Sequence, residues 1–336
     1  MTIAWLVFML IVGRALATGA AFADQAASAA RRPRRFLWLA GLIATAAWPL
    51  LALGILHLAQ EEAFARGWDV GVPGHAPMIV LTVPTWVGPS WLDRSFFFLW
   101  GLTSTVLLAR LAVLAYRLGN WQRSLPLVEV DGVPVRLARD VGPAVVGVRA
   151  MDVVLPTWAL ALEPSCRRLV LSHEQQHLQA RDPSLIWIAA IVTALVPWNL
   201  FVWWQASRLR LAVELDCDAR VLHRDPRPLV YARLLLQIAE RSSSTTSSTV
   251  LAPALVERAT RLEYRLAAIR ARHDTIRPSR GVAYTLAATG AVVLACAIRA
   301  PTLPYLFARF DAHRTQDIRW APFFTRYRRR MPTPAR

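Results

Sequence analysis

The chain has 336 residues, of which 55% are hydrophobic and 14 are tryptophan, and its mean hydropathy is +0.35. This composition is typical of a membrane protein and argues against an ordinary soluble domain. The net charge of +17 comes with no lysine and no nucleic-acid recognition motif, so direct nucleic-acid binding is not expected. Three cysteines far apart in the sequence argue against a disulfide scaffold.

Four segments are long and apolar enough to span a bilayer, and they lie at about 3–22, 36–59, 95–116 and 281–300. The first has an alternative interpretation, because Ala20-Ala21-Phe22-Ala23 resembles the cleavage site of a signal peptide. No positive charge precedes its apolar run and Arg14 interrupts it, which favours a retained helix.

The distribution of arginines predicts which loops face the cytoplasm. Arg31, Arg32, Arg34 and Arg35 crowd the first short loop, which the positive-inside rule places in the cytoplasm. Three spans then put residues 117–280 in the cytoplasm. The same topology places the arginine-rich tail, 301–336, outside, against the rule; a tail docked inside, with 281–300 not spanning, is the alternative.

A small β-sheet is predicted after the third span. Leu127–Val130 and Val133–Arg136 flank Asp131-Gly132, a strong signal for a hairpin turn. Two further β-prone runs, 144–148 and 153–156, follow. Such a sheet either offers an edge to which a peptide substrate adds as a strand, or only covers the helix that follows.

The motif His173-Glu174-Gln175-Gln176-His177 is the H-E-x-x-H pattern. On a helix the two histidines lie one turn apart on one face and can bind one Zn²⁺. Glu174 is then the candidate general base that takes a proton from the attacking water. The alternative is a chance match on an ordinary helix, which would lack a third ligand.

A third ligand is available in Glu214. Asp218, four residues later, faces the same side of a helix and can orient a ligating histidine. The alternative is an acidic helical face balanced by arginines. Asp182 is either another such orienting carboxylate or a helix-ending Asp-Pro. His223 and Arg220 are candidate donors to the oxyanion of the transition state, and Cys217 is interpreted as a small packed residue.

The apolar run 184–206 needs separate treatment. A single crossing there would put Glu214 on the opposite side of the membrane from His173 and His177, and 23 residues are too few to cross twice. We therefore predict a membrane-associated helical hairpin with Pro197-Trp198-Asn199 at its bend. A spanning helix without a zinc site is the alternative.

Two segments follow the predicted site. The Ser/Thr-rich tract 241–249 is predicted to be a linker, because it has nothing to bury. Residues 254–277 resume helical periodicity and carry many arginines, which suits a cytoplasmic helix near anionic lipid.

Several of these motifs resemble those of the BlaR/MecR-type membrane zinc metallopeptidases, the antirepressor sensor peptidases of bacteria. The similarity covers roughly residues 95–300. It is carried by 141–143 with 153–156, by Leu169–His177 with Asp182, by Trp198-Asn199 with Val202-Trp203, by Glu214–Leu222, and by the arginine-rich Arg261–Arg265.

The resemblance implies a gluzincin site with His173, His177 and Glu214 as zinc ligands, Glu174 as base, and Asp218 as the carboxylate that orients a ligand. The expected fold is mainly α: a polytopic membrane protein whose zinc peptidase domain, 117–280, contains a small β-sheet and is inserted between transmembrane helices. The family's β-lactam sensors carry a penicillin-binding domain after the last span. Only about 36 residues follow it here, so covalent antibiotic sensing is not expected.

The sequence thus predicts a multi-pass zinc endopeptidase of the bacterial inner membrane, with its active site facing the cytoplasm. Its partners would be the lipid bilayer and a protein or peptide substrate, such as a cytoplasmic transcriptional repressor or its own 241–249 tract. Two alternatives are a catalytically silent membrane scaffold or sensor and a protease of membrane quality control.

Overall fold

The computed structural model describes residues 2–48, 51, 90–139, 141–148, 150–244, 252–271 and 278–297. The helices are α1 (Thr2–Ala29), an unlabelled helix Arg35–Trp48, α3 (Ser90–Ser124), α4 (Pro164–Gln179), α5 (Asp182–Leu195), α6 (Leu200–Arg224), α7 (Pro228–Ser244), α8 (Ala252–Ala271) and α9 (Pro278–Ala297). The strands are β1 (Leu127–Val130), β2 (Val133–Ala138), β3 (Ala144–Val146) and β4 (Asp152–Pro156), and a short 3₁₀ helix, Thr157–Ala161, follows β4.

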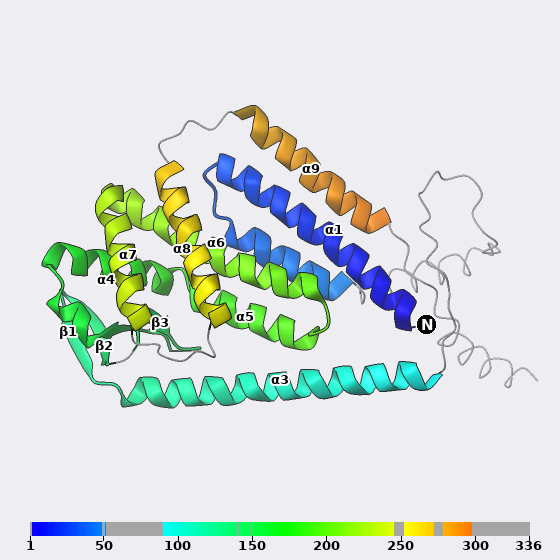
Figure 1. Ribbon diagram of the computed structural model, residues 1–336, viewed down its shortest axis with the longest axis horizontal. Coiled ribbons are helices and arrows are strands. Elements are labelled where there is room, and N and C mark those ends of the chain that lie inside the picture. Colours follow the sequence, from blue (N-terminus) through cyan, green and yellow to red (C-terminus); the bar gives the residue numbers. More distant parts are fainter. Residues whose placement is uncertain are drawn as a thin grey trace, which may run out of the picture.

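A four-stranded sheet lies at one end of the molecule (Figure 1). Its order is β1-β2-β4-β3, with β2 and β4 parallel and both outer pairs antiparallel. Asp131 and Gly132 both have positive φ, at 50° and 79°, as a two-residue hairpin turn of type I′ requires. The predicted hairpin is therefore present, and β3 forms an outer edge of the sheet.

Helix α4 packs against this sheet, and α6 and α7 pack against α4, around one hydrophobic core. The core includes Val153 and Leu155 of β4, Val170 of α4, Val221 of α6 and Tyr231 of α7. A second core joins α5 and α6 to α1 and the helix Arg35–Trp48. The site described below lies where these two cores meet, so its side chains are held by both halves of the fold.

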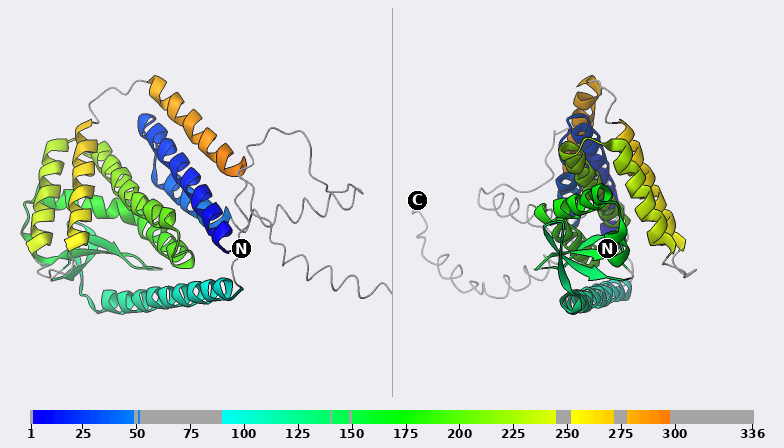
Figure 2. Two further views of the ribbon diagram at one scale, coloured as in Figure 1. Left: turned by 45° about the vertical axis from the view of Figure 1, so that its right-hand side comes forward. Right: turned by 90° about the vertical axis from the view of Figure 1, so that its left-hand side faces the viewer.

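The helix Arg35–Trp48 approaches α1 and α6 closely at Gly41. A Cβ atom there would lie 2.7 Å from Oε1 of Gln205 on α6 and 3.0 Å from Cβ of Ala20 on α1. Only glycine allows this spacing without a shift of a neighbour. The two N-terminal helices are thereby packed directly against α6 (Figures 1 and 2).

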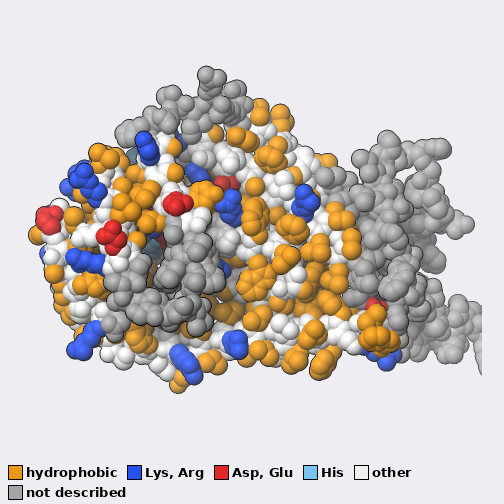
Figure 3. Space-filling view, in the orientation of Figure 1, with side chains coloured by type: hydrophobic (Ala, Val, Ile, Leu, Met, Phe, Trp, Pro, Cys, Tyr) orange, Lys and Arg blue, Asp and Glu red, His pale blue; other side chains and the backbone are white. Residues whose placement is uncertain are grey.

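Two described helices are long and apolar enough to cross a membrane: Trp5–Ala29 within α1 and Trp91–Ser124 within α3. They differ in burial, since 44% of the apolar window in α1 is buried but only 6% of that in α3. Large apolar side chains such as Phe97, Phe98 and Leu99 are therefore exposed along α3. Figure 3 shows the molecule in the orientation of Figure 1. Hydrophobic side chains cover much of the right half of the face in view, while charged side chains gather mostly in the left half.

The expectation of a mainly α fold with a small β-sheet is confirmed. The four-span topology stays a prediction, because the described apolar parts Arg35–Trp48 and Gly281–Val293 are shorter than a span. Three predicted segments lie wholly or partly outside the described residues: the part of 36–59 after residue 48, except residue 51; the linker 241–249 after residue 244; and the tail 301–336. The first residues of the predicted linker belong to α7, which continues to Ser244.

Candidate metal centre

The motif His173–His177 lies on α4, as the spacing requires. Glu163 caps the first turn by accepting a hydrogen bond from the backbone N–H of Ser165, and Pro164 begins the helix. One face of α4, including Val170 and Glu174, is buried. On this face the Nε2 atoms of His173 and His177 lie 3.2 Å apart.

The other ring nitrogen of His177 is held by Asp182. Helix α4 ends at Gln179, Arg181 takes a left-handed conformation with φ of 52°, and Asp182 begins α5. This tight turn brings the Asp182 carboxylate to 2.8 Å from Nδ1 of His177. Because the carboxylate accepts, Nδ1 carries the proton, and Nε2 is left to face His173.

The Nδ1 atom of His173 is held by a residue of another helix, Tyr231 on α7, at 2.8 Å. The Tyr231 hydroxyl donates to Asp218 at 2.6 Å, so it accepts from His173. Arg265 of α8 in turn donates to both oxygens of Asp218, at 2.7 and 2.8 Å. Asp218 thus orients His173 through a tyrosine, since its own oxygen is 3.8 Å from the ring nitrogen.

Glu214 on α6 approaches the two Nε2 atoms. Its oxygens lie 3.7 Å from Nε2 of His173 and 3.9 Å from Nε2 of His177. Arg265 holds the carboxylate at 3.0 Å. Two nitrogen atoms on one tetrahedral Zn²⁺ lie roughly 3.3 Å apart, given bonds of about 2.0–2.1 Å. The two histidines and Glu214 therefore fit one metal ion after shifts of a few tenths of an ångström.

Cys217 is a competing donor, because its sulfur and the ring nitrogens of the two histidines all lie within 4.8 Å of one another. Its thiol is fully buried, 3.3 Å from Nδ1 of His173 and 3.4 Å from the carbonyl oxygen of the same residue. Both Nδ1 atoms already have partners, whereas Glu214 faces the Nε2 atoms. We therefore favour Glu214 over Cys217 as the third ligand.

Burial and neighbouring charges shift the ionisation of the site in opposite directions. Burial lowers the pKa of His173 well below its usual value, and the positive charges of His177 and Arg265 lower it further. Burial also opposes protonation of His177, but chiefly the hydrogen bond to Asp182 outweighs it and raises the pKa of His177 to about 11. A metal ion binds only deprotonated ring nitrogens, so metal binding at the two histidines would release any proton held there.

Glu174 is buried on α4, next to His173 in sequence, and lines the same cavity. Burial raises its pKa to about 7, and the negative charge of Glu214 adds to the shift, while the positive charges of His177 and Arg265 oppose it. Burial likewise opposes ionisation of Glu214, but Arg265 and the two histidines hold its pKa below the usual range. The two carboxyl groups therefore differ in character: Glu214 stays charged, while Glu174 exchanges a proton near neutral pH.

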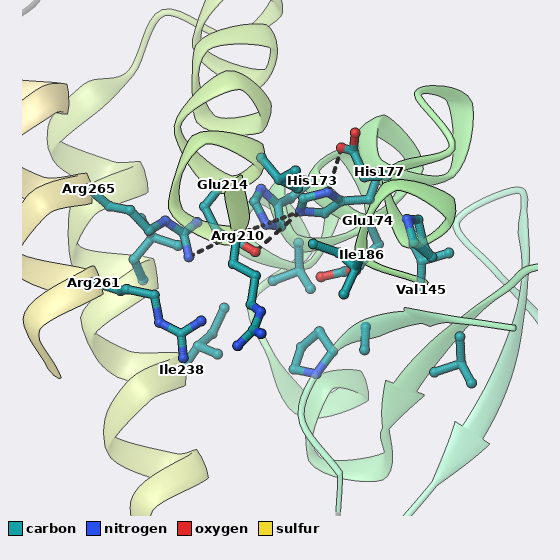
Figure 4. Close-up of a pocket in the computed structure, with 18 of the residues that line it drawn as sticks. Val145, His173, Glu174, His177, Ile186, Arg210, Glu214, Ile238, Arg261 and Arg265 are labelled. Atoms are coloured by element: carbon teal, nitrogen blue, oxygen red, sulfur yellow. Dashed lines mark hydrogen bonds and ion pairs between the residues drawn. The ribbon is translucent and has the colours of Figure 1, made fainter. Parts of the chain in front are cut away.

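A cavity of about 670 Å³ opens in front of the metal site. Residues of the edge strand β3, including Val145 and Val146, form one wall. Arg210 of α6 and Arg261 and Arg265 of α8 form another (Figure 4). The cavity is thus bounded by a strand edge and by a cationic wall, with the histidines between them.

The two predicted oxyanion donors lie elsewhere. Arg220 donates to Asp182 at 2.9 Å, and His223 is exposed near the end of α6. Neither lines the cavity, where the cationic side chains are those of Arg210, Arg261 and Arg265.

Sequence reasoning missed Tyr231, Arg265 and Arg35 as parts of the site. From the sequence alone, Arg35 indicates only the topology and Arg265 only an arginine-rich helix. Only Tyr231 carries a signal in the sequence, as a polar hydroxyl within the apolar helical run 228–236, while Arg35 and Arg265 stand among other arginines. The structure adds Arg35 as a partner of Asp182, at 2.7 Å.

Two histidines one turn apart on α4 and the Glu214 carboxylate on α6 form a donor set of the metallopeptidase class, and the buried Glu174 lies beside them on α4. Consistent with this chemistry, residues 133–269 match the model of the family described as BlaR1 peptidase M56. The match confirms the BlaR/MecR-type resemblance and supports a metallopeptidase role. No curated protein and no solved structure gives a significant match to the chain.

Proposed function

We propose that the protein is an integral membrane zinc endopeptidase that cleaves a peptide bond at the cytoplasmic face of a bacterial inner membrane, in regulatory signalling. The observation that carries this proposal is the convergence of three donor groups beside one cavity. Nε2 of His173 and Nε2 of His177 lie 3.2 Å apart, and the Glu214 carboxylate lies within 3.9 Å of both. The donor chemistry favours zinc in a gluzincin-type site.

A zinc ion bound there would act as a Lewis acid on the scissile carbonyl and make water acidic at neutral pH. Glu174, on the same helix as both histidines, is placed to take the proton from the attacking water and to return it to the leaving amine. Tyr231 and Asp182 keep the proton on Nδ1 of each ring, so that both Nε2 atoms stay available.

The edge strand β3 supports a peptide as the substrate. Ala144–Val146 pair with β4 on one side only among the described residues, and the same strand lines the cavity. An extended peptide can therefore add to β3 as a further strand and pass in front of Glu174. Candidate substrates are a cytoplasmic repressor and the chain's own 241–249 tract.

The exposed apolar surface of α3 supports the membrane part of the proposal. Its apolar window is almost unburied within the protein, so a hydrocarbon environment would cover it. The cytoplasmic placement of the site rests on the positive-inside argument for Arg31, Arg32, Arg34 and Arg35.

The test is to purify the full chain in detergent and to measure zinc content together with cleavage of co-expressed proteins. We expect about one zinc ion per chain. Glu174→Gln should retain the metal and lose cleavage by roughly two orders of magnitude or more. Glu240→Gln, which removes an exposed carboxylate outside the cavity, is the matched control and should cleave normally.

The outcomes separate the alternatives. A silent scaffold or sensor would bind metal and show no cleavage that depends on Glu174. A fragment of the chain itself that disappears in Glu174→Gln would identify self-cleavage. Absence of zinc from the wild-type protein would remove the proposal.

A further inference from the structure

The turn that joins the two N-terminal helices is tied to the metal site. The backbone N–H groups of Arg34 and Arg35 donate to the carboxylate of Asp216, at distances of 2.9–3.1 Å. Asp216 lies on α6, two residues beyond the candidate ligand Glu214. While the backbone of Arg35 binds Asp216, its side chain donates a hydrogen bond to Oδ1 of Asp182 at 2.7 Å.

Asp182 is where this chain of contacts meets a candidate metal ligand. Asp182 as a whole residue is only 1% exposed. Oδ1 binds Arg35, whereas Oδ2 binds both Nδ1 of His177 and Arg220. Each oxygen thus has its own partners, and Arg35 fixes the rotation of the carboxylate that holds the His177 ring.

A purely structural role explains this arrangement less well. Arg35 is 9% exposed, and its buried Nε atom has no hydrogen-bond partner among the described residues. A buried ion pair with incomplete hydrogen bonding contributes little net stability compared with apolar packing. The orientation of the Asp182 carboxylate, in contrast, depends directly on the guanidinium group of Arg35, because no other described group binds Oδ1.

We propose that Arg35 is a positioning residue of the metal site: through Asp182 it orients His177, so the N-terminal helices complete a centre whose ligands all lie elsewhere in the chain. The candidate ligands and Asp182 fall within residues 133–269, which match the peptidase family, and Arg35 lies outside that region. A displacement of the turn at residues 30–35 relative to α5 and α6 would therefore reach His177 through one side chain. The inference rests on the proposed metal-binding role of His177.

The experiment compares Arg35→Gln, Arg35→Lys and Arg32→Gln in the full chain. Arg32 is the matched control, because it is exposed in the same turn and is not among the residues that line the cavity. Zinc affinity is measured by competition with a chelator, and the Co²⁺-substituted proteins are compared by their visible absorption. We expect Arg35→Gln to weaken zinc binding roughly 10- to 100-fold and to change the cobalt spectrum. Arg35→Lys should recover most of the affinity, and Arg32→Gln should match the wild type.

A double-mutant cycle separates positioning from a general loss of stability. If Arg35 acts through Asp182, Arg35→Gln should weaken zinc binding far less in an Asp182→Asn background than in the wild type. Equal losses in both backgrounds would overturn the proposal, as would wild-type affinity and an unchanged cobalt spectrum in Arg35→Gln. Failure of the wild type to bind zinc would instead remove the proposed function, and this inference with it.

Discussion

At the scale of single residues, the site is defined by which nitrogen of each histidine is engaged. Tyr231 holds Nδ1 of His173 and Asp182 holds Nδ1 of His177, so both rings present Nε2 to the same point. Two different helices supply these partners. This explains why the two rings face each other in perpendicular orientation, with ring centroids 4.7 Å apart.

The choice between Glu214 and Cys217 as third ligand gives a first prediction. Glu214 faces both Nε2 atoms, whereas Cys217 contacts Nδ1 of His173 and its carbonyl oxygen. We expect Glu214→Gln to lower zinc affinity by two orders of magnitude or more, because a charged ligand is lost, and Cys217→Ala to change it by about tenfold or less. Zinc content after dialysis against a chelator measures both. Loss of metal in Cys217→Ala alone would reverse the assignment.

The cationic wall of the cavity gives a second prediction, on substrate preference. Arg210 lines the cavity and has no ion-pair partner among the described residues, so a carboxylate of the substrate can bind it. We expect Arg210→Gln to lower kcat/KM roughly threefold to tenfold for peptides with an acidic side chain near the cut, and to leave neutral peptides nearly unchanged.

The matched control for Arg210 is Arg208→Gln. Arg208 stacks on Trp204 and Tyr264 and does not line the cavity. The same loss for acidic and neutral peptides in Arg210→Gln would exclude a charge-selective role.

At the scale of elements, polar contacts fix how α3 leaves the sheet. Gln122 near the end of α3 donates to Asp152 of β4 at 2.8 Å, and Arg136 of β2 donates to the same oxygen. Burial opposes ionisation of Asp152, but the hydrogen bonds from Arg136 and Gln122 outweigh it and lower the pKa. One carboxylate therefore ties the long apolar helix to the two central strands.

A pH-dependent prediction follows for Asp152. Its folded-state pKa lies below the unfolded value, so its stabilising contribution is fully present above the unfolded pKa of about 3.9 and is lost as the pH falls through the folded value. We expect Asp152→Asn to lower stability at pH 7 by about 0.5–1 kcal/mol, since the group is partly exposed, and the difference to vanish in acid.

Thermal unfolding of the full chain in detergent, between pH 7 and pH 3, measures this effect. Glu129→Gln on β1 removes an exposed carboxylate from the same sheet and is the control. A difference between Asp152→Asn and the wild type that stays constant across the pH range would contradict the linkage.

At the scale of the whole molecule, one region carries the candidate site and another carries the exposed apolar surface. The N-terminal helices pack on α6, and their turn binds Asp182 and Asp216, while α3 packs on α5, which begins at Asp182. The protein thus brings apolar helices into direct contact with the residues that orient the site.

This arrangement predicts stable membrane association through α3. We expect the full chain to remain in the membrane fraction after alkaline carbonate extraction. Replacing Phe98, Leu102 and Val106 by arginine should release a large fraction of it, because each arginine at the centre of a membrane helix costs about 2.5–3.5 kcal/mol. Leu229→Arg is the control, since Leu229 is exposed outside the candidate spans. Unchanged extraction of the triple variant would mean that the other predicted spans anchor the chain without α3.

Much of this protein follows from local sequence. The spacing of His173 and His177 on a helix, the Asp131-Gly132 turn and the apolar runs each depend on residues within a few positions of one another, and so periodicity and turn chemistry find them. Glu214 can also be predicted from the sequence, because its helix and its four-residue spacing to Asp218 are local patterns.

The tertiary structure decided which distant side chains complete the site. Tyr231 lies 58 positions from His173, Arg265 lies 47 from Asp218, and Arg35 lies 147 from Asp182. Helical periodicity tells which face of a helix is buried, but it does not tell which residue of another helix that face meets. Those pairings arise only when the two cores pack against each other, because the packing brings the helices that carry the partners together.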